Sequence, residues 1–371
     1  MLMKEGWEYK KLEDICSKGS SNISLNKIED NFGDYNLYGA SGLVKGIDFY
    51  HQDKPYIGIV KDGSGVGRVD IYPPKSSLVG TMQYIFPKED CEIGFLKYLL
   101  QGLHLEKFKT GAAIPHIYFK DYGKSKVLFP PISEQQQIVE ELDLLSAIIE
   151  KKKAQLNELD NLAQSLFYEM FGDPVANEKG WEIDTLENVV SDDCSISYGI
   201  VQPGNEIENG IPVVRPVDMT NSVIYRKGLK TIEKTISDSY KRTILSGGEL
   251  LFCVRGTTGI MSFASDELDG CNVTRGITPL SFGRRINKYY AFHYLSTKYM
   301  QSIIAEKTYG IALKQINMKE VRVLPILLPP LSLQQQFASK IEAIEHQKEL
   351  IKQSIKEVET LFNSRMDYYF N

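Results

Sequence analysis

Two copies of one segment decide the architecture of this chain: PPISEQQQIVEELDLL at residues 130–145 and PPLSLQQQFASKIEAI at residues 329–344. Each begins with a Pro-Pro pair, which interrupts regular structure, and continues with apolar residues at steps of three and four. Ser133 and Ser332 are each followed three residues later by a glutamine, a spacing that predicts a capping box at a helix start. We therefore predict one helix after each Pro-Pro pair.

The apolar spacing continues well beyond both segments and predicts two helices of about 35–38 residues, roughly 50–57 Å long at ~1.5 Å per residue. The first is expected to end before Gly172, which precedes a proline, and the second at Phe370-Asn371. The seam positions expected in a coiled coil are Leu142, Leu145, Ile149, Lys152, Leu156 and Leu159 in the first helix, and Ile341, Ile344, Lys348, Ile351, Ile355 and Val358 in the second.

Each seam contains a lysine where its counterpart has an apolar residue. At the offset of 199 between the two Pro-Pro segments, Lys152 aligns with Ile351 and Lys348 aligns with Ile149. Complementary substitutions of this kind suit two helices that pack on each other, and they could fix the register of the pair. The alternative is that the lysine stems simply extend from the seam to water.

The duplication includes the segments ahead of the helices. GWEYKKLEDI at residues 6–15 returns as GWEIDTLENV at residues 180–189, an offset of 174, so the second copy has gained about 25 residues in its middle. If the two helices pair antiparallel, the two copies are related by a pseudo-twofold axis. The domains expected are a first body at 1–131, a helix at 132–172, a linker at 173–179, a second body at 180–330 and a helix at 331–371.

The bodies combine strand and helix signals. Short runs of β-branched and aromatic residues, such as KPYIGIV at 54–60 and ELLFCVRG at 249–256, alternate with glycine, asparagine and proline clusters. Helical spacing occurs at 93–108 and at 288–307, ahead of each Pro-Pro pair. The predicted fold class is α+β, with two pseudo-twofold-related globular domains separated by two long antiparallel helices that form a coiled coil.

Composition limits the function classes. The chain has 371 residues, a net charge of −5 and no apolar run long enough to span a membrane, and we expect it in the cytoplasm. The five cysteines form no CxxC pair and the five histidines no HExxH spacing, so we predict neither disulfides nor a metal site. Residues 1–130 and 180–330 each carry 17 basic and 16 acidic side chains, whereas the two helical segments together carry 9 and 16. Near-neutral bodies can bind a phosphate backbone only where their cations cluster.

The paired Pro-Pro segments, the two GWE segments and FGDPVANEKGWEIDTLENV together resemble the specificity subunits of type I restriction-modification systems, over essentially the whole chain. The resemblance implies two target-recognition domains, each reading one half of a split DNA sequence, and conserved helices that set the spacer and dock two adenine-N6 methyltransferase subunits. Restriction and translocase subunits join for cleavage. S-adenosylmethionine, ATP and magnesium are expected on those partners and no cofactor on this chain, which would be non-catalytic. A specificity module of a related type IIB or IIG-like methyltransferase-nuclease is the alternative.

Glycine-rich segments are the candidate DNA contacts, because glycine lets backbone approach phosphate and nearby polar side chains reach phosphates or base edges. KDGSGVGRV at 61–69 corresponds to RGTTG at 255–259, and a tight hairpin with solvated charges remains the alternative interpretation. The candidates are Lys61, Ser64, Arg68, Tyr38, Ser41, Lys45, Arg215, Arg255, Thr257, Thr258 and Arg275.

Motifs for catalysis in this chain are weak. The glycine run at 63–67 lacks the GK[ST] ending of a P-loop, and Gly123-Lys124-Ser125 has Tyr118 where the upstream glycine belongs. The Pro-Pro pairs lack the preceding Asn or Asp of amino-methyltransferase motifs. We therefore predict no catalytic residues. A self-contained modification enzyme and a coiled-coil adaptor without a DNA role are the rival hypotheses.

Overall fold

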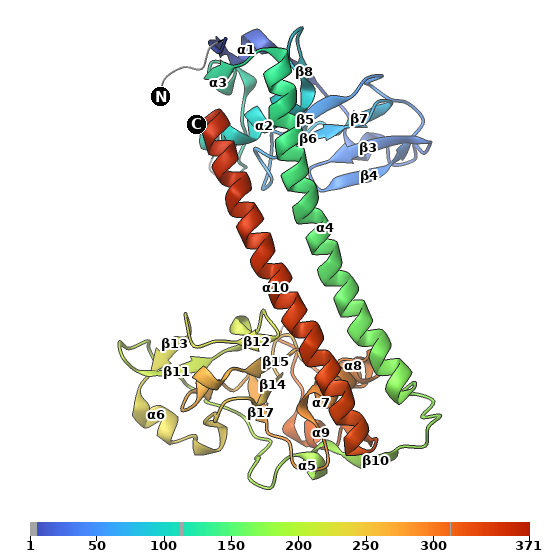
Figure 1. Cartoon of the computed structure of the whole chain (residues 1–371), viewed down its shortest axis with the longest axis vertical. Helices are drawn as coiled ribbons and strands as arrows, with labels where there is room; N and C mark the ends of the chain where they lie inside the picture. The colour runs from blue at the N-terminus through green and yellow to red at the C-terminus, as the bar shows by residue number, and fades with distance from the viewer. Residues whose placement is uncertain (1–5, 112–113, 312) are drawn as a thin grey trace. The chain divides into compact units, whose positions relative to one another are not determined.

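The computed structural model describes residues 6–111, 114–311 and 313–371. The chain divides into two compact units: unit 1 comprises residues up to Ala154 together with Ile351–Asn371, and unit 2 is Gln155–Leu350. Each unit contains one body of sheets and short helices, and parts of two long helices. These are α4 (Ile132–Phe171, green in Figure 1) and α10 (Leu331–Phe370, red). The predicted α+β class with two long helices is confirmed.

The body of unit 1 is built on three sheets. Its elements are β1 (Glu8–Lys11), α1 (Leu12–Ile15), β2 (Cys16–Ser20), η1 (Leu25–Lys27), β3 (Tyr35–Gly39), β4 (Gly42–Ile47), β5 (Tyr56–Val60), β6 (Val69–Tyr72), β7 (Ser76–Leu78), β8 (Met82–Pro87), α2 (Ile93–Gly102), η2 (Leu105–Phe108), α3 (Phe119–Tyr122) and β9 (Lys126–Phe129). The sheet orders are β2-β8-β5-β6, β4-β3-β7 and β1-β9. Helix α2 packs on β5, β6 and β8.

The body of unit 2 also has three sheets, in the orders β12-β15-β14-β17, β13-β11-β16 and β10-β18. Its elements are β10 (Glu182–Thr185), α5 (Leu186–Val189), β11 (Ile211–Val214), η3 (Pro216–Asp218), β12 (Val223–Ile224), β13 (Lys230–Ile232), α6 (Lys234–Asp238), η4 (Lys241–Thr243), β14 (Leu250–Cys253), β15 (Met261–Ala264), η5 (Asp266–Leu268), β16 (Asn272–Val273), β17 (Ile277–Leu280), α7 (Lys288–Leu295), α8 (Lys298–Glu306), α9 (Met318–Arg322) and β18 (Pro325–Leu328).

The sheets of the two bodies share a common set of strands, to which unit 1 adds β2 and unit 2 adds β12. The antiparallel order β8-β5-β6 of unit 1 recurs as β17-β14-β15 in unit 2. Strand β3 pairs antiparallel with β4 and parallel with β7, just as β11 does with β13 and β16. The extra residues of unit 2 include η3, β12, α6 and η4, which lie between these shared strands. The duplication in the sequence is thus a duplication of topology.

Each long helix begins directly after its Pro-Pro pair. In α4 the amides of Glu134 and Gln135 both donate to the carbonyl of Pro131, at 2.9 and 3.0 Å, so Ser133 already lies inside the first turn. The start of α10 is the same, with two amides donating to Pro330. The predicted capping box is therefore wrong, because a serine in the second helical position is past the cap.

The first glutamine of each QQQ run fastens the helix start instead. Gln135 is fully buried, and its side-chain amide donates to the carbonyls of Pro130 and Asp90 at 2.9 Å. Its carbonyl oxygen accepts from the amide of Glu92, the residue that caps α2, at 2.8 Å. Gln334 makes the same three bonds in unit 2. Because unpaired buried polar groups are costly, each glutamine ties a long helix to its body.

Within unit 1, the last turns of α10 pack antiparallel on the first half of α4. Arg365 bonds Glu141 with its Nη2 2.8 Å from the Oε2 of that carboxylate, and the hydroxyl of Tyr369 donates to the same carboxylate. The hydrogen bond from Arg365 lowers the pKa of Glu141 and outweighs the opposing effect of burial. The aromatic ring of Phe370 also packs on Phe95 of α2, at 5.6 Å between centroids.

Within unit 2, the second half of α4 packs antiparallel on the first half of α10. Phe337 is fully buried between Phe167 and Phe171, at centroid distances of 5.8 and 5.2 Å. The ammonium of Lys348 lies 2.7 Å from carboxylate oxygens of Asp160 on α4 and of Glu345 one turn before it. Burial lowers the pKa of Lys348, but these two hydrogen bonds outweigh it and leave the pKa raised. The lysine therefore stays charged in the seam.

The seam positions proposed from the sequence are buried or half-buried in both halves of the helix pair. Within the described residues, no helix combines the length and the apolar character needed to cross a membrane.

Candidate nucleic-acid interface

A tight glycine loop joins β5 to β6 in unit 1. Gly63 and Gly67 have φ angles of +93° and +94°, which a side chain strongly disfavours. The amide of Gly67 donates to the carbonyl of Val60 at 2.9 Å, which closes the loop at its base. A Cβ on Gly67 would lie 3.0 Å from the backbone nitrogen of Glu106 in η2. These glycines let the loop turn sharply against the neighbouring backbone.

This loop is fastened to a hairpin that lies some fifty residues further along the chain. Thr110 and His116 exchange two backbone hydrogen bonds of 2.9 Å and form the hairpin base. The amide of Gly63 donates to Pro115 at 2.9 Å, and the amide of Ile117 donates to Lys61 at 3.0 Å. We call residues 61–68 with the described residues 110, 111 and 114–117 loop pair 1.

Unit 2 repeats the arrangement with different side chains. Tyr309 and Gln315 exchange two backbone bonds of 2.9 Å, the amide of Gly256 donates to Lys314 at 2.8 Å, and the amide of Ile316 donates to Val254 at 3.0 Å. We call residues 254–260 with the described residues 309–311 and 313–316 loop pair 2. The correspondence of the two glycine segments, proposed from the sequence, therefore holds at the level of single hydrogen bonds.

Loop pair 1 presents polar side chains beside a cavity of about 480 Å³. Ser64 and Arg68 are exposed, and Arg68 Nε lies 3.4 Å from the carbonyl of Gly65. The half-buried ammonium of Lys61 is 3.8 Å from the carboxylate of Asp62. The cavity brings Arg68 together with Ser41 from the β3–β4 turn, and its other polar lining residues are Asp70, Tyr72 and Gln101. Sequence reasoning missed Asp70 and Gln101.

Loop pair 2 presents threonines and the exposed Lys314, where loop pair 1 presents Ser64 and Arg68. Thr257 is exposed, and the hydroxyl of Thr258 lies 3.1 Å from that of Thr308 beside a cavity of about 340 Å³ that Lys314 also lines. Within the described part of the chain, the Nε of Arg255 is buried without a hydrogen-bond partner. Arg275 is exposed. It lies on a turn that is held next to this loop, since the amide of Val254 donates to the carbonyl of Gly276.

Three further candidates, Lys45, Arg215 and Tyr38, form hydrogen bonds with other residues of the chain. The ammonium of Lys45 donates to the carbonyls of Ile28 and Glu29 at 3.0 and 2.9 Å and lies over the ring of Phe32. Arg215 holds Asp218 with bonds of 3.0 and 2.8 Å, and these hydrogen bonds raise the pKa of its guanidinium. The hydroxyl of Tyr38 accepts from Asn36 at 3.0 Å, and its ring packs on Tyr72. The partners of Lys45 lie sixteen and seventeen residues away and are not apparent from the sequence, whereas Asp218 and Asn36 lie within three residues of Arg215 and Tyr38.

The candidates also left out the two hairpins, although the sequence contained a signal for them. The hairpins GAAIPH at 111–116 and GIALKQ at 310–315 occupy the same position relative to the Pro-Pro pairs, at the offset of 199. Their role became visible only when the hydrogen bonds to the glycine loops joined segments about fifty residues apart.

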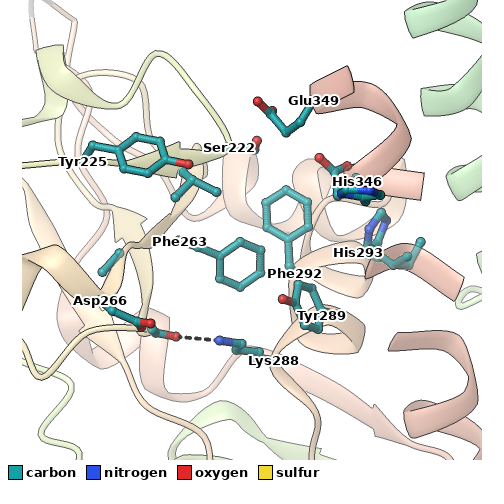
Figure 2. Close-up of a pocket in the computed structure, with 15 residues that line it drawn as sticks. Ser222, Tyr225, Phe263, Asp266, Lys288, Tyr289, Phe292, His293, His346 and Glu349 are labelled. Atoms are coloured by element: carbon teal, nitrogen blue, oxygen red, sulfur yellow. Dashed lines mark hydrogen bonds between the residues drawn. The ribbon is translucent and has the colours of Figure 1, made fainter. Parts of the chain in front are cut away.

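A further cavity, of about 290 Å³, lies in unit 2 between the body and α10. Figure 2 shows the rings of Phe263 and Phe292 in its middle, with Glu349 towards one end and Asp266 and Lys288 towards the other. The ammonium of Lys288 is 3.4 Å from the carbonyl of Gly248. The lining is largely aromatic, with both acidic and basic side chains at the rim, so the chemistry of this cavity differs from that of the polar loop pairs.

Comparisons with proteins of known sequence agree on one family. The chain is 22% identical over 259 residues to the EcoBI specificity subunit of a type I restriction enzyme from Escherichia coli, covering 63% of this chain and 54% of that protein. It is 23% identical to the MjaIX specificity subunit from Methanocaldococcus jannaschii, covering 70% and 64% respectively. The chain thus matches between half and two thirds of the length of these relatives.

Solved structures share the fold. The S subunit of a type I restriction-modification system from M. genitalium matches with a TM-score of 0.60 at 12% identity, over 100% of this chain and 98% of that one. A second structure, from a study of complex assembly in the type I system, matches with a TM-score of 0.57 at 17% identity, over 99% and 98%. The family model described as the type I restriction modification DNA specificity domain matches twice, at residues 4–161 and 194–360. The chain therefore belongs to the family of type I restriction-modification DNA specificity domains.

Proposed function

We propose that this chain is the DNA sequence-specificity subunit of a type I restriction-modification complex. Each body reads one half of a bipartite DNA site through its loop pair, and the two long helices set the spacer between the halves. The observation that carries this proposal is that one backbone frame occurs twice while its exposed side chains differ. Such a pair suits two half-sites of different sequence, because phosphate contacts position a protein and side chains at base edges specify the sequence.

The proposed partners are double-stranded DNA, two adenine-N6 methyltransferase subunits and the restriction and translocase subunits. In this proposal the chain itself performs no catalysis. Its partners bind S-adenosylmethionine, ATP and magnesium. The family membership and the names of the relatives support this division of labour.

Exchanging residues 180–330 for the second body of another specificity subunit is expected to change one half of the methylated motif and leave the other half intact. The reason is that each loop pair is fastened only to segments of its own body. Sequencing that detects N6-methyladenine across the host genome reads the motif directly. Deleting the gene serves as the control and should abolish methylation at the motif. A motif that changes in both halves, or methylation that survives the deletion, contradicts the proposal.

The long helices carry exposed leucines that suit the docking of a partner helix. Leu162 on α4 and Leu361 on α10 occupy the same position in the repeat, and they are 52% and 49% exposed. Apolar side chains at equivalent positions of two helices are typical of surfaces that another helix covers. The surplus of acidic side chains in the helical segments also disfavours DNA there.

Replacing Leu162 and Leu361 by serine is therefore expected to weaken association with the methyltransferase subunits by roughly tenfold or more per leucine. Binding is measured by biolayer interferometry, with the melting temperature recorded in parallel. The matched control is Val175→Ser, which changes an aliphatic residue that is 67% exposed outside both helices. Unchanged affinity in the leucine variants would exclude this docking surface and leave the DNA-reading role untouched.

A further inference from the structure

The two hairpin tips expose an aliphatic side chain at the same position. Ile114 in loop pair 1 is 64% exposed and Leu313 in loop pair 2 is 46% exposed, and the two residues are related by the repeat offset of 199. Ile311, beside Leu313 on the second tip, is fully exposed. An aliphatic side chain that stays in water adds nothing to the free energy of folding. Aliphatic residues at equivalent exposed positions of two diverged copies therefore indicate a surface that a binding partner covers.

The described residues of the two hairpins share the same backbone contacts. Gly111 and Gly310 have φ angles of +89° and +104°. A Cβ on either glycine would lie 2.5 or 2.3 Å from the carbonyl oxygen of Ile114 or Leu313, respectively. Each tip is also hydrogen-bonded to its glycine loop, as described above. The backbone on which Ile114 and Leu313 lie is therefore held to each glycine loop, which lowers the entropic cost of placing these side chains against a partner.

The charges around the tips identify the partner. Loop pair 1 carries Lys61, Arg68 and one carboxylate, Asp62, and loop pair 2 carries Arg255 and Lys314 and no carboxylate. The acidic residues Glu106, Asp121, Glu306 and Glu320 flank the two hairpins. Lys109 and Lys314 are exposed, whereas Lys307 pairs with Glu320. An aliphatic side chain with cations around it suits a ligand that has apolar groups between closely spaced negative charges. Duplex DNA has this character, since the thymine methyl group and the base stack lie between the phosphates.

We propose that Ile114 and Leu313 enter a groove of the two half-sites and make apolar contacts with the bases, while the neighbouring lysines bind phosphates. This inference rests on the proposed function and adds a specific role to it. The aliphatic contact contributes affinity that salt does not screen. The lysines contribute the salt-dependent part of the binding affinity, which decreases as ionic strength rises because binding releases counterions from the phosphates.

The test measures DNA binding by the assembled complex of full-length chain and methyltransferase subunits across a series of salt concentrations. The probe is a fluorescent duplex that carries the motif mapped from genomic methylation. Ile114→Ser and Leu313→Ser are each expected to lower affinity about tenfold at every salt concentration, with the slope of log affinity against log salt unchanged. Lys314→Gln is expected to reduce that slope by about one. Val175→Ser should change neither quantity.

Replacing thymine by uracil throughout one half-site at a time adds a second readout. If the contact is to a thymine methyl group, uracil in the half-site read by unit 1 weakens the wild type and has little further effect on Ile114→Ser. If the contact is to the base stack, the serine variant loses affinity equally on both duplexes, which also supports the proposal.

Two results separate failure of this inference from failure of the proposed function. The apolar contact is contradicted if the serine variants bind DNA with the same affinity as Val175→Ser. It is also contradicted if they lose affinity only through a changed salt slope. Neither result contradicts the proposal that the chain recognises DNA. A wild-type complex with no preference for the methylated motif overturns the proposed function itself. Melting temperatures of the variants establish that these exposed substitutions leave the fold intact.

Discussion

Replacing Phe337 by alanine is expected to cost unit 2 about 3–5 kcal/mol of unfolding free energy, the range for removing a fully buried phenylalanine. The ring has no exposed surface and contacts Phe167 and Phe171 of α4. It also lies edge-on to the imidazole of His293, with 5.2 Å between the ring centroids. The substitution therefore leaves a cavity at the point where α4, α7 and α10 meet.

The two tryptophans make this measurement specific, since Trp7 lies in unit 1 and Trp181 in unit 2. In a Trp7→Phe background, the fluorescence of Trp181 during urea denaturation follows unit 2 alone. Leu350→Ala on the same helix is the control, because its side chain is 55% exposed and its truncation should cost no more than about 0.5 kcal/mol. Equal losses in Phe337→Ala and Leu350→Ala would mean that the aromatic cluster does not hold the helices together.

Acid is expected to destabilise unit 2 by about 3 kcal/mol through His293 alone. The pKa of this imidazole is lowered from 6.5 to about 4, chiefly by burial and also by the ammonium of Lys348, against the opposing charge of Asp160. The native state therefore binds fewer protons than the unfolded state between these two pH values. Stability is fully present above pH 6.5 and falls as the pH decreases towards 4, at about 1.4 kcal/mol per pH unit.

Urea denaturation of the wild type and of His293→Gln, each at pH 7.5, 6, 5 and 4.5, isolates this contribution. Carboxylates such as Glu141 titrate in both proteins, so their effect cancels in the difference. The stability lost between pH 7.5 and 4.5 should be smaller in His293→Gln by roughly 2–3 kcal/mol. If the two proteins lose the same stability, the buried imidazole does not remain neutral in the folded state.

The two copies of the repeat use different side-chain contacts where the body packs on the long helix. At the position of His293 in α7, unit 1 has Tyr98 in α2, whose hydroxyl donates to Asp143 at 2.6 Å. Lys97 lies 3.6 Å from the same carboxylate. Unit 2 instead has Phe292 and His293 packed against α10, and it is here that the aromatic cavity opens. The acid sensitivity predicted above therefore belongs to unit 2, although the backbone frame is shared.

Local patterns predicted the parts of the fold that depend on nearby residues. The three-and-four spacing predicted two long helices, and the Pro-Pro pairs located their starts to within a residue. The repeat predicted two bodies of one topology. The failed capping box shows where local reasoning stops. Ser133 has the right spacing to cap a helix, but Gln135 can bond to Asp90 and Glu92, and that outcome depends on a turn more than forty residues away.

At the candidate interface, too, local patterns predicted some features and the tertiary structure decided the others. The glycine spacing marked both loops, and the repeat related them to each other. Only the tertiary structure decided that Lys45 is held by the carbonyls of Ile28 and Glu29, whereas Arg68 and Ser41 share a cavity. By itself, then, the sequence determined the duplication, the helices and the glycine turns, because these follow from contacts within a few residues. Tertiary structure decided which side chains remain exposed at the loop pairs, because hydrogen bonds and burial depend on segments that meet only in the folded chain.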